Sequence, residues 1–446
     1  MDWKRIPLLA GLIVPLAAAP ASSKALTFHQ DVEPILQARC QSCHHPGDIG
    51  PMPLLTYQHV RPWAKAIRAA VLQKKMPPWF ADPRYGEFLN NRSLPQSEID
   101  TLVNWVDSGA QEGDSKDAPQ PLAFSSDWHI GKPDAIVELP KPFQVPAAGT
   151  IPYQYVRVPT GFTEDKWVTA VEVQPGNRQV IHHMNAAAIP PGSALAKMMP
   201  VGEYIPLDNE ASNRALIKAG KEPPMFAGGT EGELLEVFVP GTVAKPLLPG
   251  QARLIRAGSD LMLQIHFTPD GKPDEDRSRV GFVFARQPPE ERIRGTLVYN
   301  VHFTIPAGAS DHRVQARAVL KEDVKLVSLL PHMHVRGKDF LFRAVYPSGE
   351  SEVLLSVPNY DFHWQINYYL KTPKLLPKGT LLECVGHFDN SPNNPSNPNP
   401  KVDVSYGEQT WEEMLNGFME VAIDPRIPTP ELFASAPATS AALVNR

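Results

Sequence analysis

Proline restricts what this chain can fold into more than any other residue does. Forty-eight prolines stand among 446 residues, against 29 glycines. Because proline has a fixed φ and no backbone N–H, it breaks helices and central strands. The composition therefore favours many short strands joined by long loops. The length also exceeds that of one ordinary domain and suggests about three.

Helical spacing of apolar residues is concentrated between Leu26 and Asp114. We expect helices there at 31–40, 63–75 and 98–108. Beyond a proline-containing linker, short alternating runs of apolar and polar residues replace this pattern. We expect strands at 167–173, 261–267, 280–284, 324–330 and 380–387.

These patterns predict a multidomain protein, with an α-helical domain followed by two all-β sandwiches of the jelly-roll kind. About 300 strand-rich residues suit two sandwiches better than one. Prolines and a charge cluster at 287–294 mark the change between them. The expected parts are a helical domain at 26–115, a linker at 116–130, sandwiches at 131–290 and 291–430, and a tail at 431–446.

The first 25 residues have the pattern of an export signal. Lys4 and Arg5 precede an apolar run at 6–19, and small residues follow it. A membrane anchor is the alternative, but the run is short and contains two prolines. We expect a signal peptide at 1–25, no membrane span after its cleavage, and a periplasmic or secreted protein.

The net charge argues against a nucleic-acid-binding protein, and the cysteine content argues against a disulfide-stabilised one. The net charge of -5 gives no basic excess, so nucleic acid is not an expected partner. The three cysteines are too few for a disulfide framework, so the domains must rely on their cores.

Cys40, Cys43 and His44 form the motif Cys-x-x-Cys-His, the attachment signature of c-type haem. Residues three apart share one helix face, so both thiols can reach the vinyl groups of one porphyrin. His44 is then delivered to the iron as the proximal ligand. A structural zinc site would need further ligands nearby, and no second cysteine pair is present. The sequence therefore predicts one covalently bound haem c, and a cytochrome c domain at 26–115.

The sixth iron ligand is expected to be a thioether or imidazole that follows a helix. Met76 comes directly after the expected helix at 63–75, and Pro77 stiffens the loop behind it. Met52, in a second proline-rich loop, is the alternative, although methionines in such loops usually serve packing. We expect Met76 to be the ligand.

Histidines in the strand-rich part have spacings suited to metal ligands. His332 and His334 are two apart, so a strand projects both from one face. His182 and His183 are adjacent and would point to opposite faces of a regular strand, so joint ligation requires a bend or bulge. Taken alone, a histidine such as His266 is more often a half-buried side chain with a backbone partner.

The combination of ligand types favours copper. Imidazoles alone suit copper or zinc, whereas two imidazoles with a thioether, such as that of Met414, favour Cu(I) because this sulfur is soft. Redox-active copper also has a use beside a c-type electron carrier, whereas zinc has none. We therefore expect two copper ions in addition to the haem.

Between about residues 130 and 425 the chain resembles the ascorbate-dependent copper monooxygenases, the family of dopamine β-monooxygenase and peptidylglycine α-hydroxylating monooxygenase. The segments 360–365 and 388–391 look like family segments. Four further elements occur in the family's order: His-His-Met at 182–184, Leu-Gln-Ile-His-Phe at 263–267, His-Met-His at 332–334 and Glu-Glu-Met at 412–414.

The resemblance implies a role for each candidate ligand. An electron-transfer copper would be held by His182, His183 and His266. The copper that meets O2 would be held by His332, His334 and Met414, which are the catalytic residues in this interpretation. In the family each copper lies on its own β-sandwich, in agreement with the expected domain count.

The chain departs from the family at several positions. Cys384 stands at one end of a family disulfide, but Leu415 replaces its partner, so we expect a free buried thiol. Leu330 replaces an arginine that clamps the substrate carboxylate in the peptide-amidating enzyme, and Phe418 replaces a tyrosine that assists it. Asn416 alone matches. A peptide substrate is therefore not expected, and the N-terminal haem domain is foreign to the animal enzymes.

The resemblance implies hydroxylation of a C–H bond of a small organic substrate by O2, with one oxygen atom entering the product and one leaving as water. Two electrons are needed. We expect them to pass through the fused haem from an external donor, a small reductant or a redox protein. The alternatives are a non-catalytic haem and copper electron-transfer protein, and a binding or structural module without metal.

Overall fold

The structure is a computed structural model. It describes residues 25–48, 50–124, 128–206, 210–219, 221, 232–239, 244–427 and 432–435. The expected signal peptide lies outside these residues apart from Ala25, and the expected tail lies outside them apart from 432–435. No helix among the described residues has the length and apolar character needed to cross a membrane.

The N-terminal part is helical, as the spacing of its apolar residues predicts. Its core includes Phe28, Leu36, Leu102 and Trp105, which are fully buried. The three expected helical segments are confirmed. The elements are η1 (Phe28–Val32), α1 (Glu33–Arg39), α2 (Tyr57–Val60), η2 (Arg61–Trp63), α3 (Ala64–Leu72), α4 (Gln96–Asp107) and η3 (Ser115–Asp117).

A first β-sandwich follows. One layer has the order β6-β3-β9-β5-β7 and the other has the order β1-β11-β4-β8. Apolar residues from both layers meet in one core, among them Val156, Val171, Leu263 and Phe282. The elements are β1 (Ala135–Glu138), β2 (Phe143–Val145), β3 (Gln154–Pro159), β4 (Lys166–Gln174), β5 (Ile181–Ile189), α5 (Ala194–Met198), β6 (Ile205–Pro206), α6 (Glu210–Lys218), β7 (Glu233–Phe238), β8 (Gln251–Ile255), β9 (Asp260–Phe267), β10 (Asp274–Asp276) and β11 (Arg279–Phe284).

A second β-sandwich is formed by the rest of the chain. Its layers have the orders β17-β16-β19-β14-β22 and β12-β21-β15-β18. Its separate core includes Leu326, Phe340, Phe342 and Val421. The strands are β12 (Glu291–Asn300), β13 (Thr304–Ile305), β14 (His312–Leu320), β15 (Val324–His332), β16 (Gly337–Val345), β17 (Ser351–Val357), β18 (Tyr368–Leu376), β19 (Leu381–Phe388), β20 (Val404–Ser405), β21 (Leu415–Ile423) and β22 (Phe433–Ser435).

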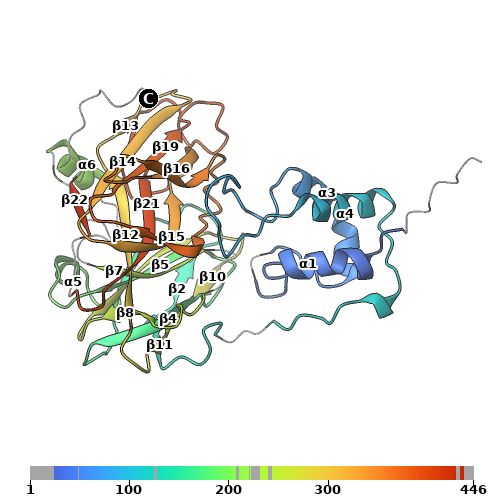
Figure 1. Cartoon of the computed structure of the whole chain (residues 1–446), viewed down its shortest axis with the longest axis horizontal. Coiled ribbons are helices and arrows are strands. Elements are labelled where there is room, and N and C mark those ends of the chain that lie inside the picture. The colour runs from blue at the N-terminus through green and yellow to red at the C-terminus, as the bar shows by residue number, and fades with distance from the viewer. Residues whose placement is uncertain are drawn as a thin grey trace, which may run out of the picture.

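One sheet runs through both sandwiches. Parallel pairing of β8 with β12, through Gln251 with Glu291 and Ala252 with Arg292, joins the two four-stranded layers into eight strands. All five strands expected from alternation are confirmed, as β4, β9, β11, β15 and β19. The sandwiches are therefore fixed to one another by backbone hydrogen bonds, and the helices α1, α3 and α4 lie together beside them (Figure 1).

Candidate metal centre

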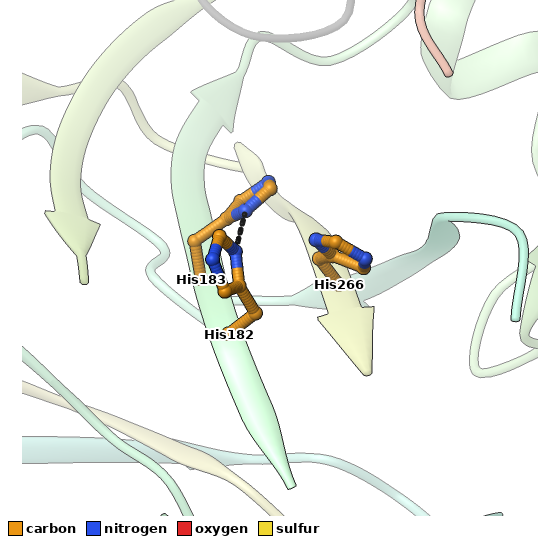
Figure 2. Close-up of side chains that lie close together, drawn as sticks. All are labelled: His182, His183 and His266. Carbon is orange, nitrogen blue, oxygen red and sulfur yellow. Dashed lines mark hydrogen bonds between the residues drawn. The ribbon is translucent and has the colours of Figure 1, made fainter. Parts of the chain in front are cut away.

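Three histidines meet on one face of the first sandwich. His182 and His183 come from β5, and His266 comes from the paired strand β9. One potential ligand atom from each lies within 4.8 Å of those of the other two. Figure 2 shows the rings of His182 and His183 joined by a hydrogen bond, with His266 beside them. The three residues that the resemblance assigns to one copper site are thus brought together.

A β-bulge allows adjacent histidines to share a site. The register between β5 and β9 shifts between Ile181 and His183, so that Ile181 pairs with Phe267 and His183 pairs with His266. The extra residue, His182, therefore does not turn to the face opposite His183 as it would on a regular strand. The irregularity required for joint ligation is confirmed.

An observation independent of the resemblance also favours a metal ion among the three rings. His182 Nε2 and His266 Nδ1 are buried and have no hydrogen-bond partner among the described residues, an arrangement that costs free energy unless a ligand is present. His182 Nδ1 and His183 Nδ1 are 3.3 Å apart. This contact is a hydrogen bond, so it engages these two nitrogens and leaves His182 Nε2 for a ligand.

Burial keeps these imidazoles neutral. It lowers the pKa of His182 to about 4 and that of His266 to about 3, with a further lowering from neighbouring histidines. The pKa of His183 is also far below its usual value, chiefly because of burial. A neutral imidazole keeps the lone pair that a metal requires.

A second pair, His332 and His334, lies where β15 ends, and Met333 between them points into the core of the second sandwich. His332 donates through Nδ1 to Gln365 Oε1 at 2.6 Å, and His334 donates through Nδ1 to the carbonyl oxygen of Glu412 at 3.2 Å. These bonds engage Nδ1, so Nε2 is the nitrogen of each ring that is available to a metal ion. His334 Nε2 is buried with no partner among the described residues.

Met414 lies beside this pair because β21 is paired with β15, with Asn416 opposite His332. Asn416 Nδ2 donates to the sulfur of Met414 at 3.3 Å. Met414 belongs to a small cluster with Val301 and Tyr406. Met419, on β21 itself, belongs to the main core of the second sandwich. The two methionines therefore have different surroundings.

One pocket between the sandwiches is lined by the second group of ligands and by one histidine of the first group. His183, His332, His334 and Met414 contribute to its wall. Its volume of about 30 Å³ leaves space for one or two waters, since one water needs roughly 10–15 Å³. Phe362 separates the groups: its ring stacks on His182 at 5.3 Å and meets His334 edge-on at 6.1 Å between centroids.

The wall of the pocket also contains the residues at which the chain departs from the copper monooxygenases. Leu330, Phe418 and Asn416 line it beside His332. An apolar leucine and phenylalanine therefore form part of the pocket wall. Cys384 is a buried free thiol, as expected.

Several residues that support the ligands were not identified from the sequence. Tyr153 contacts His183 and His266, at 5.2 and 4.7 Å between ring centroids. The hydroxyl of Tyr360 forms two hydrogen bonds with the backbone of Met333. It donates to the carbonyl oxygen of Met333 at 2.7 Å and accepts from the amide of Met333 at 3.1 Å. Tyr360 falls in one of the segments that resemble the family, whereas nothing in the pattern around Tyr153 marks it.

The Cys-x-x-Cys-His segment forms the turn that follows α1. Cys40 and Cys43 are free thiols, and burial raises the pKa of Cys40 to about 12, which makes a free-thiol redox role unfavourable. His44 donates through Nδ1 to the carbonyl oxygen of Met52 at 3.0 Å, which fixes the ring and leaves Nε2 for a ligand. A Cβ on Gly50 would lie 2.7 Å from His44 Nδ1, so this close approach requires glycine.

A cavity of about 600 Å³ lies between the helical part and the second sandwich, within the size range of cofactor sites. Met76, Leu94 and Ile99 contribute to its wall. Leu94 and Cys40 both pack against the helical core, and so does Met52. Met76 therefore faces open space, whereas Met52 is engaged in packing. The wall mixes apolar and charged side chains, and Cys40, Cys43 and His44 are not among the residues that line it.

Comparisons with known proteins do not identify a family. No family model matches the chain, and no curated protein matches it. Among solved structures, the infectious bursal disease virus Gt strain structure is similar with a TM-score of 0.18 and 10% identity, covering 70% of this chain and 76% of that chain. The Gx strain structure gives 0.19 and 9%, covering 68% and 75%. TM-scores this low support no argument about fold or function.

Proposed function

We propose that the protein is a copper-dependent monooxygenase that hydroxylates a C–H bond of a small organic substrate with O2, using electrons delivered through a haem c attached at Cys40 and Cys43. One observation carries the proposal. Three neutral histidines lie within ligand distance of one another, and two of their buried nitrogens have no partner among the described residues; a second group of two histidines and a methionine lines a pocket that His183 also lines.

The two ligand groups match the electron demand of the reaction. Hydroxylation combines RH, O2, two electrons and two protons to give ROH and water. Bound copper would supply one-electron redox chemistry and activation of O2. His182, His183 and His266 provide three imidazoles for one ion, and His332, His334 and Met414 provide a softer set for the other. One electron can be held at each group.

The surrounding side chains position and shield the ligands. Gln365 fixes the ring of His332 through its hydrogen bond to Nδ1, and burial lowers the pKa of His332 to about 4. Leu330 and Phe418 give the pocket an apolar wall that limits water around the reacting groups. The pocket has space for small molecules such as O2 and water.

The helical domain is proposed to be a cytochrome c domain, with Cys40 and Cys43 as thioether anchors, His44 as proximal ligand and Met76 as distal ligand. The hydrogen bond from His44 to Met52 and the cavity beside Met76 support this assignment. With the proposed signal peptide at 1–25, the protein would act outside the cytoplasm and take electrons from a small reductant or a redox protein.

Oxygen uptake tests the proposal. Copper-loaded protein with reduced haem should consume O2 in an oxygen electrode when the correct member of a panel of small organic compounds is added, and hydroxylated product should form in equal amount. Zinc-loaded protein is the matched control, because zinc fills the same ligands without redox chemistry. Haem and copper that exchange electrons without any substrate-dependent O2 uptake would favour the non-catalytic electron-transfer protein.

A further inference from the structure

Glu408 is a buried carboxyl in the wall of the pocket that His183, His332, His334 and Met414 also line. It belongs to the segment between β20 and β21 and is 5% exposed. Among the described residues that line the pocket it is the one acidic side chain, and no lysine or arginine lies with it. The carboxyl group therefore has no cationic partner in this wall.

Three side chains hold the carboxyl group, two of them from the first sandwich. The hydroxyl of Tyr155 on β3 donates to Glu408 Oε2 at 2.9 Å, and Gln264 Nε2 on β9 donates to the same oxygen at 3.3 Å. The hydroxyl of Tyr406 donates to Oε1 at 3.5 Å, which is long for a hydrogen bond between two oxygens. Asn185 Nδ2 fixes the amide of Gln264 by donating to its Oε1 at 2.7 Å. Oε2 is thus engaged by two donors, and Oε1 is the oxygen that can carry a proton.

Burial without a cation determines how readily Glu408 holds a proton. It raises the pKa of Glu408 to about 7, although the hydrogen bonds from Tyr155, Tyr406 and Gln264 act in the opposite direction. A raised pKa favours the protonated form of a carboxyl group. The group is therefore protonated below about pH 7 and ionised above it, so both forms are present at neutral pH.

The other titratable groups around Glu408 keep one protonation state near neutral pH. Burial raises the pKa of three neighbouring tyrosines above the usual value of 10, namely Tyr153, Tyr155 and Tyr406. Burial lowers the pKa of the histidines in the wall, namely His183, His332 and His334. Glu413, whose pKa is raised to about 8, accepts from two backbone amides and is not among the residues that line the pocket. Glu408 is thus the group of the described wall that can give up and regain a proton in this range.

We infer that Glu408 supplies protons to the oxygen atom that leaves as water in the proposed hydroxylation. The inference rests on the proposed function, in which RH, O2, two electrons and two protons give ROH and water. Each proton that is given up breaks the O–H bond of the carboxyl group, forms an O–H bond of the product water and leaves a carboxylate. The carboxylate regains its proton from solvent, so the solvent is the net source of both protons.

A purely structural role is the alternative, because Glu408 also joins the two sandwiches through Tyr155 and Gln264. Glu408→Gln distinguishes the two roles. The amide keeps an acceptor oxygen for Tyr155, but it has no acidic proton to release. A residue that only joins the sandwiches would tolerate this change with its turnover intact.

The dependence of turnover on pH tests the inference. In the copper-loaded protein with reduced haem, kcat should fall as the pH rises through about 7, because the proton donor becomes ionised. Glu408→Gln should lower kcat about 100-fold or more and remove this dependence. Glu236→Gln is the matched control and should keep both the rate and its pH dependence. Burial raises the pKa of Glu236 to about 8, but Glu236 lines a neighbouring pocket and is not among the residues that line this one.

Infrared spectroscopy gives a measurement that does not depend on turnover. In copper-loaded protein without substrate, the C=O stretch of one protonated carboxyl group should disappear with a midpoint near pH 7, and Glu408→Gln should lack this band. Tyr155→Phe deletes a hydrogen bond that stabilises the carboxylate, so it should move the midpoint to higher pH. The comparison of Tyr155→Phe with the unaltered protein also serves if Glu408→Gln does not fold.

The possible outcomes separate this inference from the proposed function. Metal content and the haem spectrum, measured first, show that each variant is loaded equally. With copper and haem bound, unchanged turnover and pH dependence in Glu408→Gln, or a midpoint that Tyr155→Phe does not move, overturns the inference alone. Absence of substrate-dependent O2 uptake in the loaded, unaltered protein contradicts the proposed function, and the proton-donating role of Glu408 with it.

Discussion

Glu413 accepts a hydrogen bond from the backbone amide of His334 at 2.9 Å, although 79 residues separate them. Its other carboxylate oxygen accepts from the amide of Arg336 at 2.7 Å. The carboxyl is completely buried, and burial raises its pKa to about 8 in spite of these bonds. Because Glu413 directly precedes Met414, this contact places the methionine and the histidine loop in one rigid unit.

Glu413→Gln should loosen that unit. A glutamine replaces one of the two acceptor oxygens of the carboxyl group with an NH2 donor, so one backbone amide loses its partner, at a cost of about 1–3 kcal/mol in the free energy of unfolding. Copper bound by His334 and Met414 should be lost first, with the haem unaffected. Thermal melting and copper analysis measure both effects. Glu412→Gln is the control, since that side chain accepts from the backbone amide of Gln409.

Met414→His tests the soft ligand. A harder ligand still binds Cu(II) but disfavours the reduced ion, so substrate-coupled O2 uptake should fall by orders of magnitude. The haem should continue to be reduced and reoxidised, because its own ligands are untouched. If Met414 serves packing alone, copper content and redox behaviour will instead be unchanged in the protein that remains folded.

Met419→His is the matched control for this substitution. Met419 is 2% exposed in the main core of the second sandwich, so the change should lower the free energy of unfolding by about 2 kcal/mol or more. Copper content and turnover of the folded fraction should not change. Loss of turnover in Met419→His but not in Met414→His would show that the ligand has been assigned to the wrong position on this strand.

Metal analysis should give two copper ions and one iron per chain. His266→Ala should remove one copper and leave the other, because it deletes one ligand of the trio on β5 and β9 alone. His334→Ala should remove the other ion. One copper per chain, or tightly held zinc in place of copper, contradicts the assignment of two copper sites.

The haem should resist extraction with acid and organic solvent, because thioether bonds at Cys40 and Cys43 are covalent. Met76→Ala should lower the reduction potential, since a thioether ligand stabilises ferrous iron. Met52→Ala should leave the potential nearly unchanged, because Met52 packs against the helical core. A fall of the potential in Met52→Ala alone would reassign the distal ligand.

Copper should be retained well below neutral pH. Burial lowers the pKa of His182 and of His332 from 6.5 to about 4. A lowered pKa means that each ring stays neutral as the pH falls, so protons compete with the metal only near pH 4. Copper content after dialysis at stepped pH measures this. Release with a midpoint near 6.5, the usual pKa of histidine, is the opposite result.

Local sequence patterns predicted much of the secondary structure. Alternation placed β4, β9, β11, β15 and β19, because side chains on a strand half buried in a sandwich have a period of two. No such signal marks the parallel pairing of Gln251 with Glu291, because the periodicity of a strand's sequence does not depend on which strand lies beside it. The sheet shared by the two sandwiches was therefore beyond prediction from local pattern.

The sequence by itself determined which residue types stand at ligand spacing: the Cys-x-x-Cys-His motif, the His-x-His pair and the adjacent histidines that require a bulge. Only the tertiary structure decided that His183 lines one pocket with the second ligand group, and that Phe362 lies between His182 and His334. It also decided which atoms remain free, because Gln365 and the carbonyl of Glu412 occupy Nδ1 of His332 and His334. Spacing is a property of neighbouring residues, whereas burial and hydrogen-bond partners depend on segments far apart in the chain.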